Sequence, residues 1–259
     1  MQDKYTAEGG IVSDHDVHRK SIKGSAMGAS KHVIVGCNVT RGDENATPRY
    51  TQWINALEGR QLLTQRYREC TLIKPTWFMS RDTFESVGSF DESGPGTPED
   101  MIFLYKHLDN FGALAKVCEP LVMYRYHAQA QSHSVKWQDI FDLRVKHIEH
   151  HLLNRLSSFS VWSAGREGKR FYRALDPRNQ TKVACFLDVK DTLIKGPGFR
   201  PSKTAVFIPI RHYTQLLVCG TDVIPRPVIT CVKLNLHSGF ETNMADVKLT
   251  EGYDCIYFA

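Results

Sequence analysis

The chain has 259 residues, of which 42% are hydrophobic, 10% aromatic and 24% charged. This length allows one large domain or two of ordinary size, and the aromatic content excludes a chain that is disordered throughout. Lys and Arg outnumber Asp and Glu by 33 to 28. Because this small excess is spread along the chain, we expect no nucleic-acid-binding tract.

Signals for export and for membrane insertion are missing from the sequence. Residues 1–20 hold no apolar segment of the kind that a signal peptide needs, and no window approaches the ~18 consecutive apolar residues of a membrane span. Seven cysteines, an odd number without a CxxC pair, argue against a disulfide framework or a zinc knuckle and predict free thiols. We therefore expect a cytoplasmic protein without a membrane span.

Apolar periodicity predicts the elements of the first half. Residues 32–38 (HVIVGCN) are a short apolar run that predicts a buried strand. A helix is predicted over residues 51–66, although Gly59 weakens its middle. Residues 71–79 (TLIKPTWFM) predict another strand, which ends or bulges at Pro75.

A strong helix signal begins at Thr97. Thr97 suits the N-cap and Pro98 the first helical position, and an apolar stripe continues until Gly112. Glu99 and Asp100 then lie in the first turn, where acids stabilise the positive end of the helix dipole without any further role. The alternative is that one of them is a general base, kept ionised by the helix terminus beside a glycine-rich loop that leaves room for a substrate.

The rest of the sequence predicts a long helix followed by a parallel sheet. Before residue 157 we expect short strands and an amphipathic helix, at residues 114–117, 121–126 and 136–156. A β-turn-α-β unit follows, with elements at residues 159–162, 166–175 and 182–189. Further strands are predicted at residues 204–210, 228–236 and 254–258.

Several motifs, in order, resemble a known family. The string PTWFMSRDTFESVGSFDESGPGTPEDMIFLYKHLDNFG, followed by LVMYRYH, resembles the carboxy-terminal part of the catalytic domain of family-2 glycosyltransferases. VIVGCNVTRGDENATPRYTQWIN and FSVWSAGREGKRFYRAL narrow the resemblance to the beta-1,3-N-acetylglucosaminyltransferase-like group. The resemblance covers residues 32–259, and it implies the GT-A fold of nucleotide-sugar transferases.

The resemblance implies an inverting hexosyltransferase. Such an enzyme transfers a sugar, here N-acetylglucosamine or a similar one, from a UDP-sugar to a hydroxyl of a glycan or other acceptor. The family's Glu-Asp pair matches Glu99 and Asp100, with Asp100 as the general base. The transition state is oxocarbenium-like, and a divalent cation, Mn²⁺ or Mg²⁺, would offset the charge that builds on the departing diphosphate.

The family also assigns substrate-binding residues. Trp77 matches a residue that lines the acceptor sugar site; its alternative is a core tryptophan. Tyr124, Arg125 and His127 match a strand end that lies toward the donor diphosphate, where Arg125 offers a forked donor for phosphate oxygens. A surface charge on an edge strand is the alternative for Arg125.

The sequence departs from the family at its start. A complete member begins with a strand-rich, nucleotide-binding half that carries an Asp-x-Asp metal motif, and this chain lacks almost all of it. Asp14 and Asp16 have that spacing and are either a metal-ligand pair or surface charge, since no buried strand leads into them. Without the strands of that first half, the sheet would expose an unpaired edge. We therefore expect a truncated or alternatively spliced product, or an incomplete gene model.

A second candidate lies in the turn of the β-turn-α-β unit. Ser163, Gly165 and Gly168 form a weakened G-x-G-x-x-G between strand and helix, and Asp188 ends the next strand. In dinucleotide-binding folds the amides of such a turn hold phosphate and the acid binds ribose. The turn therefore indicates either a nucleotide site or a Rossmann-like module used only for packing.

Three histidines share one helix. His147, His150 and His151 have the spacing of zinc ligands, but no acid or cysteine is obviously placed to complete a site. We expect them to lie on a solvated helix face.

These expectations combine into one α/β organisation, with four segments at residues 1–30 (irregular), 31–130 (partial GT-A-like domain), 131–157 (connecting helix) and 158–259 (small Rossmann-like module). The main functional hypothesis is a glycosyltransferase. The alternatives are a catalytically inactive remnant that acts as a binding or regulatory protein, and a nucleotide binder that uses the carboxy-terminal module.

Overall fold

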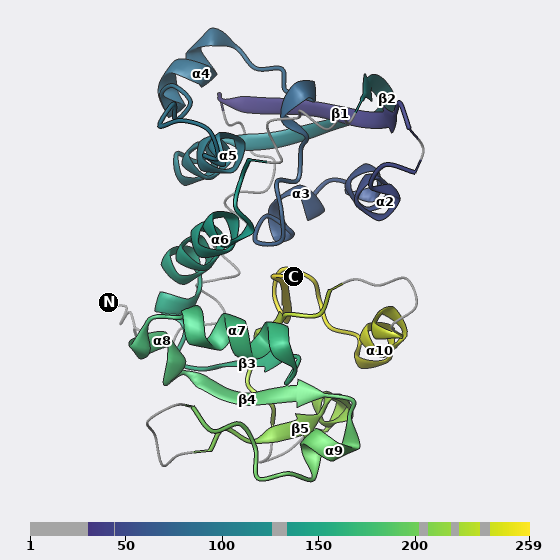
Figure 1. Cartoon of the computed structure of the whole chain (residues 1–259), viewed down its shortest axis with the longest axis vertical. Helices are drawn as coiled ribbons and strands as arrows, with labels where there is room; N and C mark the ends of the chain where they lie inside the picture. Colours follow the sequence, from purple (N-terminus) through teal and green to yellow (C-terminus); the bar gives the residue numbers. More distant parts are fainter. Residues whose placement is uncertain (1–30, 44, 126–133, 202–206, 219–222, 234–238) are drawn as a thin grey trace, which may run out of the picture.

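The structure is a computed structural model that describes residues 31–43, 45–125, 134–201, 207–218, 223–233 and 239–259. Predictions for residues 1–30, including Asp14 and Asp16, and for His127 lie outside these described residues. The described chain is a mixed α/β structure with parallel sheets. Figure 1 shows two units along the long axis, with helix α6 (Trp137–His151) between them.

The first unit is built around two parallel strands. β1 (Val33–Arg41) pairs with β2 (Ala113–Tyr124). Four helices lie between these strands in the chain: α2 (Pro48–Ala56), α3 (Gln61–Thr64), α4 (Arg81–Val87) and α5 (Glu99–Asp109). Their apolar side chains form one buried cluster, whose members include Ile34, Leu72, Met101, Phe103 and Leu104.

Two predictions for this unit were wrong. The segment predicted as a strand at 71–79 contains a 3-10 helix, η1 (Lys74–Thr76), and only Phe78 pairs with β1, through Val35. Pro75 explains this, since it has no N–H for a ladder and its fixed φ suits a helical first turn. The single helix predicted at 51–66 is two helices: the first ends before Leu57, which is extended, and Gly59 follows with a φ of 49° before the second begins.

Two further boundaries differ from the prediction. Helix α5 begins at Glu99 with Pro98 at the N-cap, and Thr97 donates its hydroxyl to Gly94 O instead of capping the helix. The two strands predicted at 114–117 and 121–126 form the continuous strand β2, which leaves large apolar side chains exposed at Leu121 and Met123.

The second unit contains the predicted parallel sheet. The β-turn-α-β prediction is confirmed: β3 (Phe159–Trp162), α7 (Arg166–Ala174) and β4 (Val183–Asp188) follow one another, and the two strands pair in parallel. Five parallel strands have the order β5-β4-β3-β6-β7. Two later strands are shorter than predicted, at β6 (Val228–Thr230) and β7 (Cys255–Tyr257). The strand predicted at 204–210 is displaced, since β5 (Ile210–His212) begins at its last residue. The other helices are η3 (Leu153–Arg155), α8 (Pro177–Gln180), α9 (Asp191–Ile194), η4 (Tyr213–Leu217) and α10 (Phe240–Val247).

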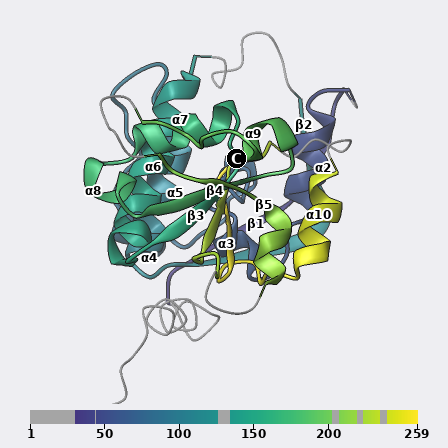
Figure 2. The same cartoon turned by 90° about the horizontal axis from the view of Figure 1, so that it is seen from below.

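Side chains alternate between the two faces of this sheet, as strand geometry requires. Val161, Phe186 and Ile229 belong to one core cluster, together with residues of α6 and α7. Trp162 and Leu187, their neighbours along the strands, belong to a second cluster with residues of α10. Figure 2 shows α7 and α8 on one side of the sheet and α10 on the other.

Helix α6 packs on both units. Ile140 and Leu143 contact the apolar cluster of the first unit, while Phe141 and Ile148 are part of the cluster under the second sheet. Arg144, which is 6% exposed, donates from Nε to Tyr67 O at 2.7 Å. Among the described residues no helix is long and apolar enough to cross a membrane.

Two glycine substitutions test the geometry of the turn between β3 and α7. A Cβ at Gly168 would lie 1.9 Å from Ser163 O, whereas a Cβ at Gly165 would meet its nearest atom, Ser163 Oγ, at 3.5 Å. Gly168→Ala is therefore expected to lower the free energy of unfolding by about 1–3 kcal/mol, and Gly165→Ala to change it little. Urea unfolding of both variants measures the free energy of unfolding. An equal loss of stability in the two variants would contradict the close approach of Gly168 to Ser163 O.

Candidate functional site

A pocket of about 910 Å³ opens at the start of α5, beside the glycine-rich loop that precedes it. Glu99 and Asp100 both line this pocket, together with side chains from the carboxyl ends of the two parallel strands. Arg41 ends β1, Tyr124 ends β2, and the two are partners in the strand register. We call this cavity the α5 pocket.

The two acids of the α5 pocket have different surroundings. Glu99 Oε1 forms an ion pair with Lys74 Nζ at 2.5 Å. Asp100 forms no ion pair within the described residues and accepts a hydrogen bond from Met101 N at 2.7 Å. Desolvation raises the pKa of Asp100, and the charge of Glu99 raises it further. Asp100 is thus a partly desolvated carboxylate that no cation neutralises directly.

Arg41 is a pocket residue that the sequence reasoning missed. Its guanidinium lies 5.0 Å from the centroid of the Tyr124 ring, and its Nε donates to Thr51 Oγ1 at 2.9 Å. Arg41 was missed because it lies three residues beyond the strand predicted at 32–38, whereas β1 continues to Arg41 and brings it to the edge of the sheet where Tyr124 ends β2. Together with Lys74, it gives the α5 pocket two cations.

Two of the predicted substrate-binding residues lie outside the α5 pocket. Trp77 donates from Nε1 to Leu72 O at 3.1 Å and stacks on Phe90, with ring centroids 6.4 Å apart. It lines a neighbouring hollow that shares Lys74 with the α5 pocket. Arg125 is exposed just beyond the end of β2. Substrate-binding roles for Trp77 and Arg125 stay predictions.

The divalent cation implied by the resemblance does not fit the described part of the α5 pocket. Asp91, Glu99 and Asp100 line it, but within the described residues only one group brings three donor atoms within 4.8 Å of one another, and that group lies elsewhere. No chemical step is therefore derived through a cation at this pocket.

The glycine-bearing turn of the second unit is held by Asp188. Its Oδ2 accepts from Ala164 N at 2.8 Å, and its Oδ1 accepts from the backbone of Val189 and Lys190 at 2.9 and 3.0 Å. Ser163, at the first motif position, has a φ of 122°, a conformation that favours glycine. The carboxylate therefore fastens the turn to β4; nucleotide-binding roles for Ser163, Gly165, Gly168 and Asp188 stay predictions.

A second pocket, of about 470 Å³, lies where the two units meet; we call it the interface pocket. Cys231 and Lys233, which follow β6, line it at the carboxyl edge of the parallel sheet. Arg68 and Arg144 line it too, and desolvation lowers the pKa of Arg68 to about 10. Nη2 of Arg144 is buried without a hydrogen-bond partner. A buried donor of this kind needs an acceptor.

The prediction of a solvated face holds for His150, which is exposed, and is wrong for His147. His147 is only 7% exposed, and burial lowers the pKa of its imidazole to about 2. Asp109, the last residue of α5, lies against His147 and His151. Asp109 was not predicted, because its approach to the histidines depends on how α5 packs against α6.

The surroundings of Asp100 predict a pH-dependent gain in stability when it is replaced by Asn. The raised pKa means that the folded protein holds the proton more tightly than the unfolded chain, so stability is highest below the unfolded pKa of about 4 and falls as the pH rises through the folded pKa. Asp100→Asn cannot ionise and escapes this loss. We expect its Tm to exceed that of the wild type increasingly from acid to neutral pH, in thermal unfolding scans.

The matched control is Asp82→Asn, which changes an exposed acid in the first turn of α4. It is expected to show no such growing gain. A Tm difference for Asp100→Asn that is the same at every pH would contradict the desolvation of this carboxylate.

Comparison with known proteins does not place this chain in a family. No protein-family model matches this chain, and no solved structure matches it. The resemblance to glycosyltransferases therefore remains an inference from the sequence motifs, and the function has to be argued from the pockets and their residues.

Proposed function

We propose that this chain is an inverting glycosyltransferase of family-2 type, with a partial GT-A-like domain followed by a Rossmann-like module. The observation that supports this most directly is the position of Asp100, which lines the α5 pocket at the start of a helix. The cysteines of the described residues are free thiols, in keeping with the cytoplasmic setting that belongs to the proposal.

Asp100 would act as the general base. Its partial desolvation raises its proton affinity, so that it takes the proton of an acceptor hydroxyl more readily than a fully solvated carboxylate. The acceptor oxygen attacks the anomeric carbon as the bond to the leaving diphosphate breaks on the opposite face, which inverts that carbon. Glu99 is already paired with Lys74, which leaves Asp100 as the base.

Arg41 is the residue of the α5 pocket that supports a phosphorylated donor. It faces the same cavity as Asp100 and forms no ion pair within the described residues, whereas Lys74 is paired with Glu99 and the other charged lining residues are acids. Its positive charge would stabilise negative charge as it develops on the leaving diphosphate. Tyr124 packs against Arg41 and orients it. UDP-N-acetylglucosamine is accordingly the first donor to test.

The test compares Asp100→Asn with the wild type in UDP release from UDP-N-acetylglucosamine with candidate acceptors and Mn²⁺. We expect a fall in turnover of about 10²–10⁴-fold, with donor binding, followed by isothermal titration, retained. Asp82→Asn, the exposed acid at the start of α4, serves as control and is expected to keep its turnover. Unchanged turnover in Asp100→Asn would remove Asp100 as the base.

The same experiment separates the enzyme from an inactive remnant. A binding or regulatory protein derived from a transferase would bind the UDP-sugar in isothermal titration but release no UDP in the wild type. That outcome would replace the catalytic proposal and leave the α5 pocket as a binding site.

A second candidate function is nucleotide binding in the interface pocket. It is favoured by Arg144, whose buried Nη2 lacks a partner and whose guanidinium lines this pocket at the carboxyl edge of the sheet. Ligands of open parallel sheets bind at that edge, where the strand order reverses, and here it reverses between β3 and β6. A phosphate or carboxylate oxygen is the acceptor that a forked guanidinium binds best.

Thermal shift with UDP, NAD and coenzyme A tests this candidate. We expect at least one of them to raise the Tm of the wild type and to raise it less in Lys233→Gln, which removes an exposed cation from the pocket rim. Lys248→Gln, an exposed lysine just after α10, is the matched control. If none of the three ligands moves the wild-type Tm, or if both variants respond like the wild type, the interface pocket does not bind these nucleotides.

A further inference from the structure

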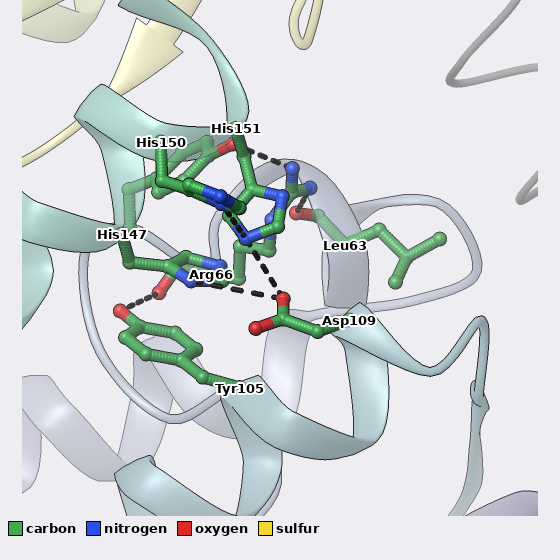
Figure 3. A network of polar contacts seen from close by, with 8 residues as sticks. Leu63, Arg66, Tyr105, Asp109, His147, His150 and His151 are labelled. Atoms are coloured by element: carbon green, nitrogen blue, oxygen red, sulfur yellow. Dashed lines mark hydrogen bonds and ion pairs between the residues drawn. The ribbon is translucent and has the colours of Figure 1, made fainter.

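Two histidines and an aspartate from neighbouring helices converge beneath the end of α5. His147 and His151 are one helical turn apart on α6, so their side chains lie on the same face. Asp109 is the last residue of α5 and points at both rings (Figure 3). Its Oδ1 lies 2.8 Å from His151 Nε2 and 4.0 Å from His147 Nδ1.

The spacing of these donors suits one transition-metal ion. The three donor atoms lie within 4.8 Å of one another. Zinc binds N and O donors at about 2.0–2.1 Å in a tetrahedron, which puts the donors about 3.3 Å apart. Asp109 Oδ1 and His147 Nδ1, now 4.0 Å apart, would have to approach by about 0.7 Å to reach that spacing. Asp109 and His151 are both partly exposed, which leaves their side chains room to rotate. Two imidazoles and one carboxylate are a ligand set that zinc uses in proteins.

His147 is the buried member of this group. Its Nδ1 faces Asp109, and its Nε2, at the opposite edge of the ring, has no hydrogen-bond partner. The Tyr105 ring stacks on it at 3.6 Å between centroids and 3° between planes, and the Tyr105 hydroxyl is itself held by Arg66 O at 3.0 Å. The imidazole is thus held in one orientation by packing against the Tyr105 ring.

The surroundings leave room for a fourth ligand. The three side chains line a pocket of about 350 Å³, which Arg66 and Arg155 line too, and Figure 3 shows Arg66 beside the group. Its guanidinium is already bound to Leu63 O at 2.8 Å and to the Tyr67 hydroxyl at 2.5 Å. Water can therefore complete a tetrahedron from the pocket side.

We propose that Asp109, His147 and His151 bind one Zn²⁺ ion that fastens the end of α5 to α6. The site is separate from the proposed catalytic one, because Asp100 lies at the other end of α5, about 14 Å away at the helical rise. Its role is to lock the packing of the first unit against the helix that joins it to the second.

Cobalt substitution of the full, untagged chain tests the site. Co²⁺ added to metal-free protein is expected to give the visible d–d bands of a tetrahedral N/O site at one ion per chain, to be displaced by Zn²⁺, and to raise the Tm. Asp109→Asn and His151→Gln are both expected to lose these bands and at least tenfold of the affinity, a lower limit set by losses of ligand-supporting groups. Both side chains are partly exposed, so the variants retain the fold.

Two controls make the result specific. His150→Gln removes the adjacent exposed histidine, which hydrogen-bonds His151 Nε2 at 3.1 Å but is not one of the three donors, and it is expected to keep the cobalt spectrum. Cys118→Ser, which removes an exposed thiol, is expected to keep it as well. The proposal is overturned if the wild type gives no tetrahedral spectrum, if Asp109→Asn and His151→Gln bind cobalt like the wild type, or if Cys118→Ser abolishes binding.

Discussion

The arrangement of this molecule depends on helix α6, which is apolar on two faces. One face packs on the cluster under α5 and the other on the sheet of the second unit, so neither unit is buried on this side without it. At its middle, Arg144 donates to Tyr67 O of the first unit and lies over the Phe258 ring of the second, 4.7 Å from the centroid. Desolvation lowers the pKa of this guanidinium. Burying the Arg144 cation with an unpaired N–H donor costs free energy of folding. A bound anion at the junction of the two units would lower this cost.

The two ends of helix α5 lie in different chemical surroundings. At its start, Asp100 faces a pocket with two cations; at its end, Asp109 faces two histidines. The first turn of a helix favours negative charge, which keeps an acid there available as a base despite desolvation. The last turn favours positive charge, so an acid at Asp109 opposes the helix dipole and gains from a cation beside it. The same reasoning therefore supports a base at one end and a metal ion at the other.

The sequence predicted what is local and missed what depends on packing between distant segments. The β3–α7–β4 unit was found because short buried runs, a glycine turn and helix signals follow one another within one stretch of chain. The strand expected around Pro75 was wrong because apolar composition was weighed above a missing N–H. Arg41 was missed because the first strand runs to residue 41 and not to residue 38. The approach of Asp109 and the burial of His147 could not be predicted, since they arise from the way α5 crosses α6.

The α5 pocket and the interface pocket share a wall, and this links the two units. Tyr50 and Glu69 line both cavities. Burial raises the pKa of Glu69, and the charge of Arg144 opposes that rise. An anion that bound the free Nη2 of Arg144 would add negative charge beside Glu69 and favour its protonated form. Protonation would in turn remove negative charge from the wall of the α5 pocket. The charge of Asp100 also raises the pKa of Glu69, so the charged groups of the two cavities are linked through this shared wall.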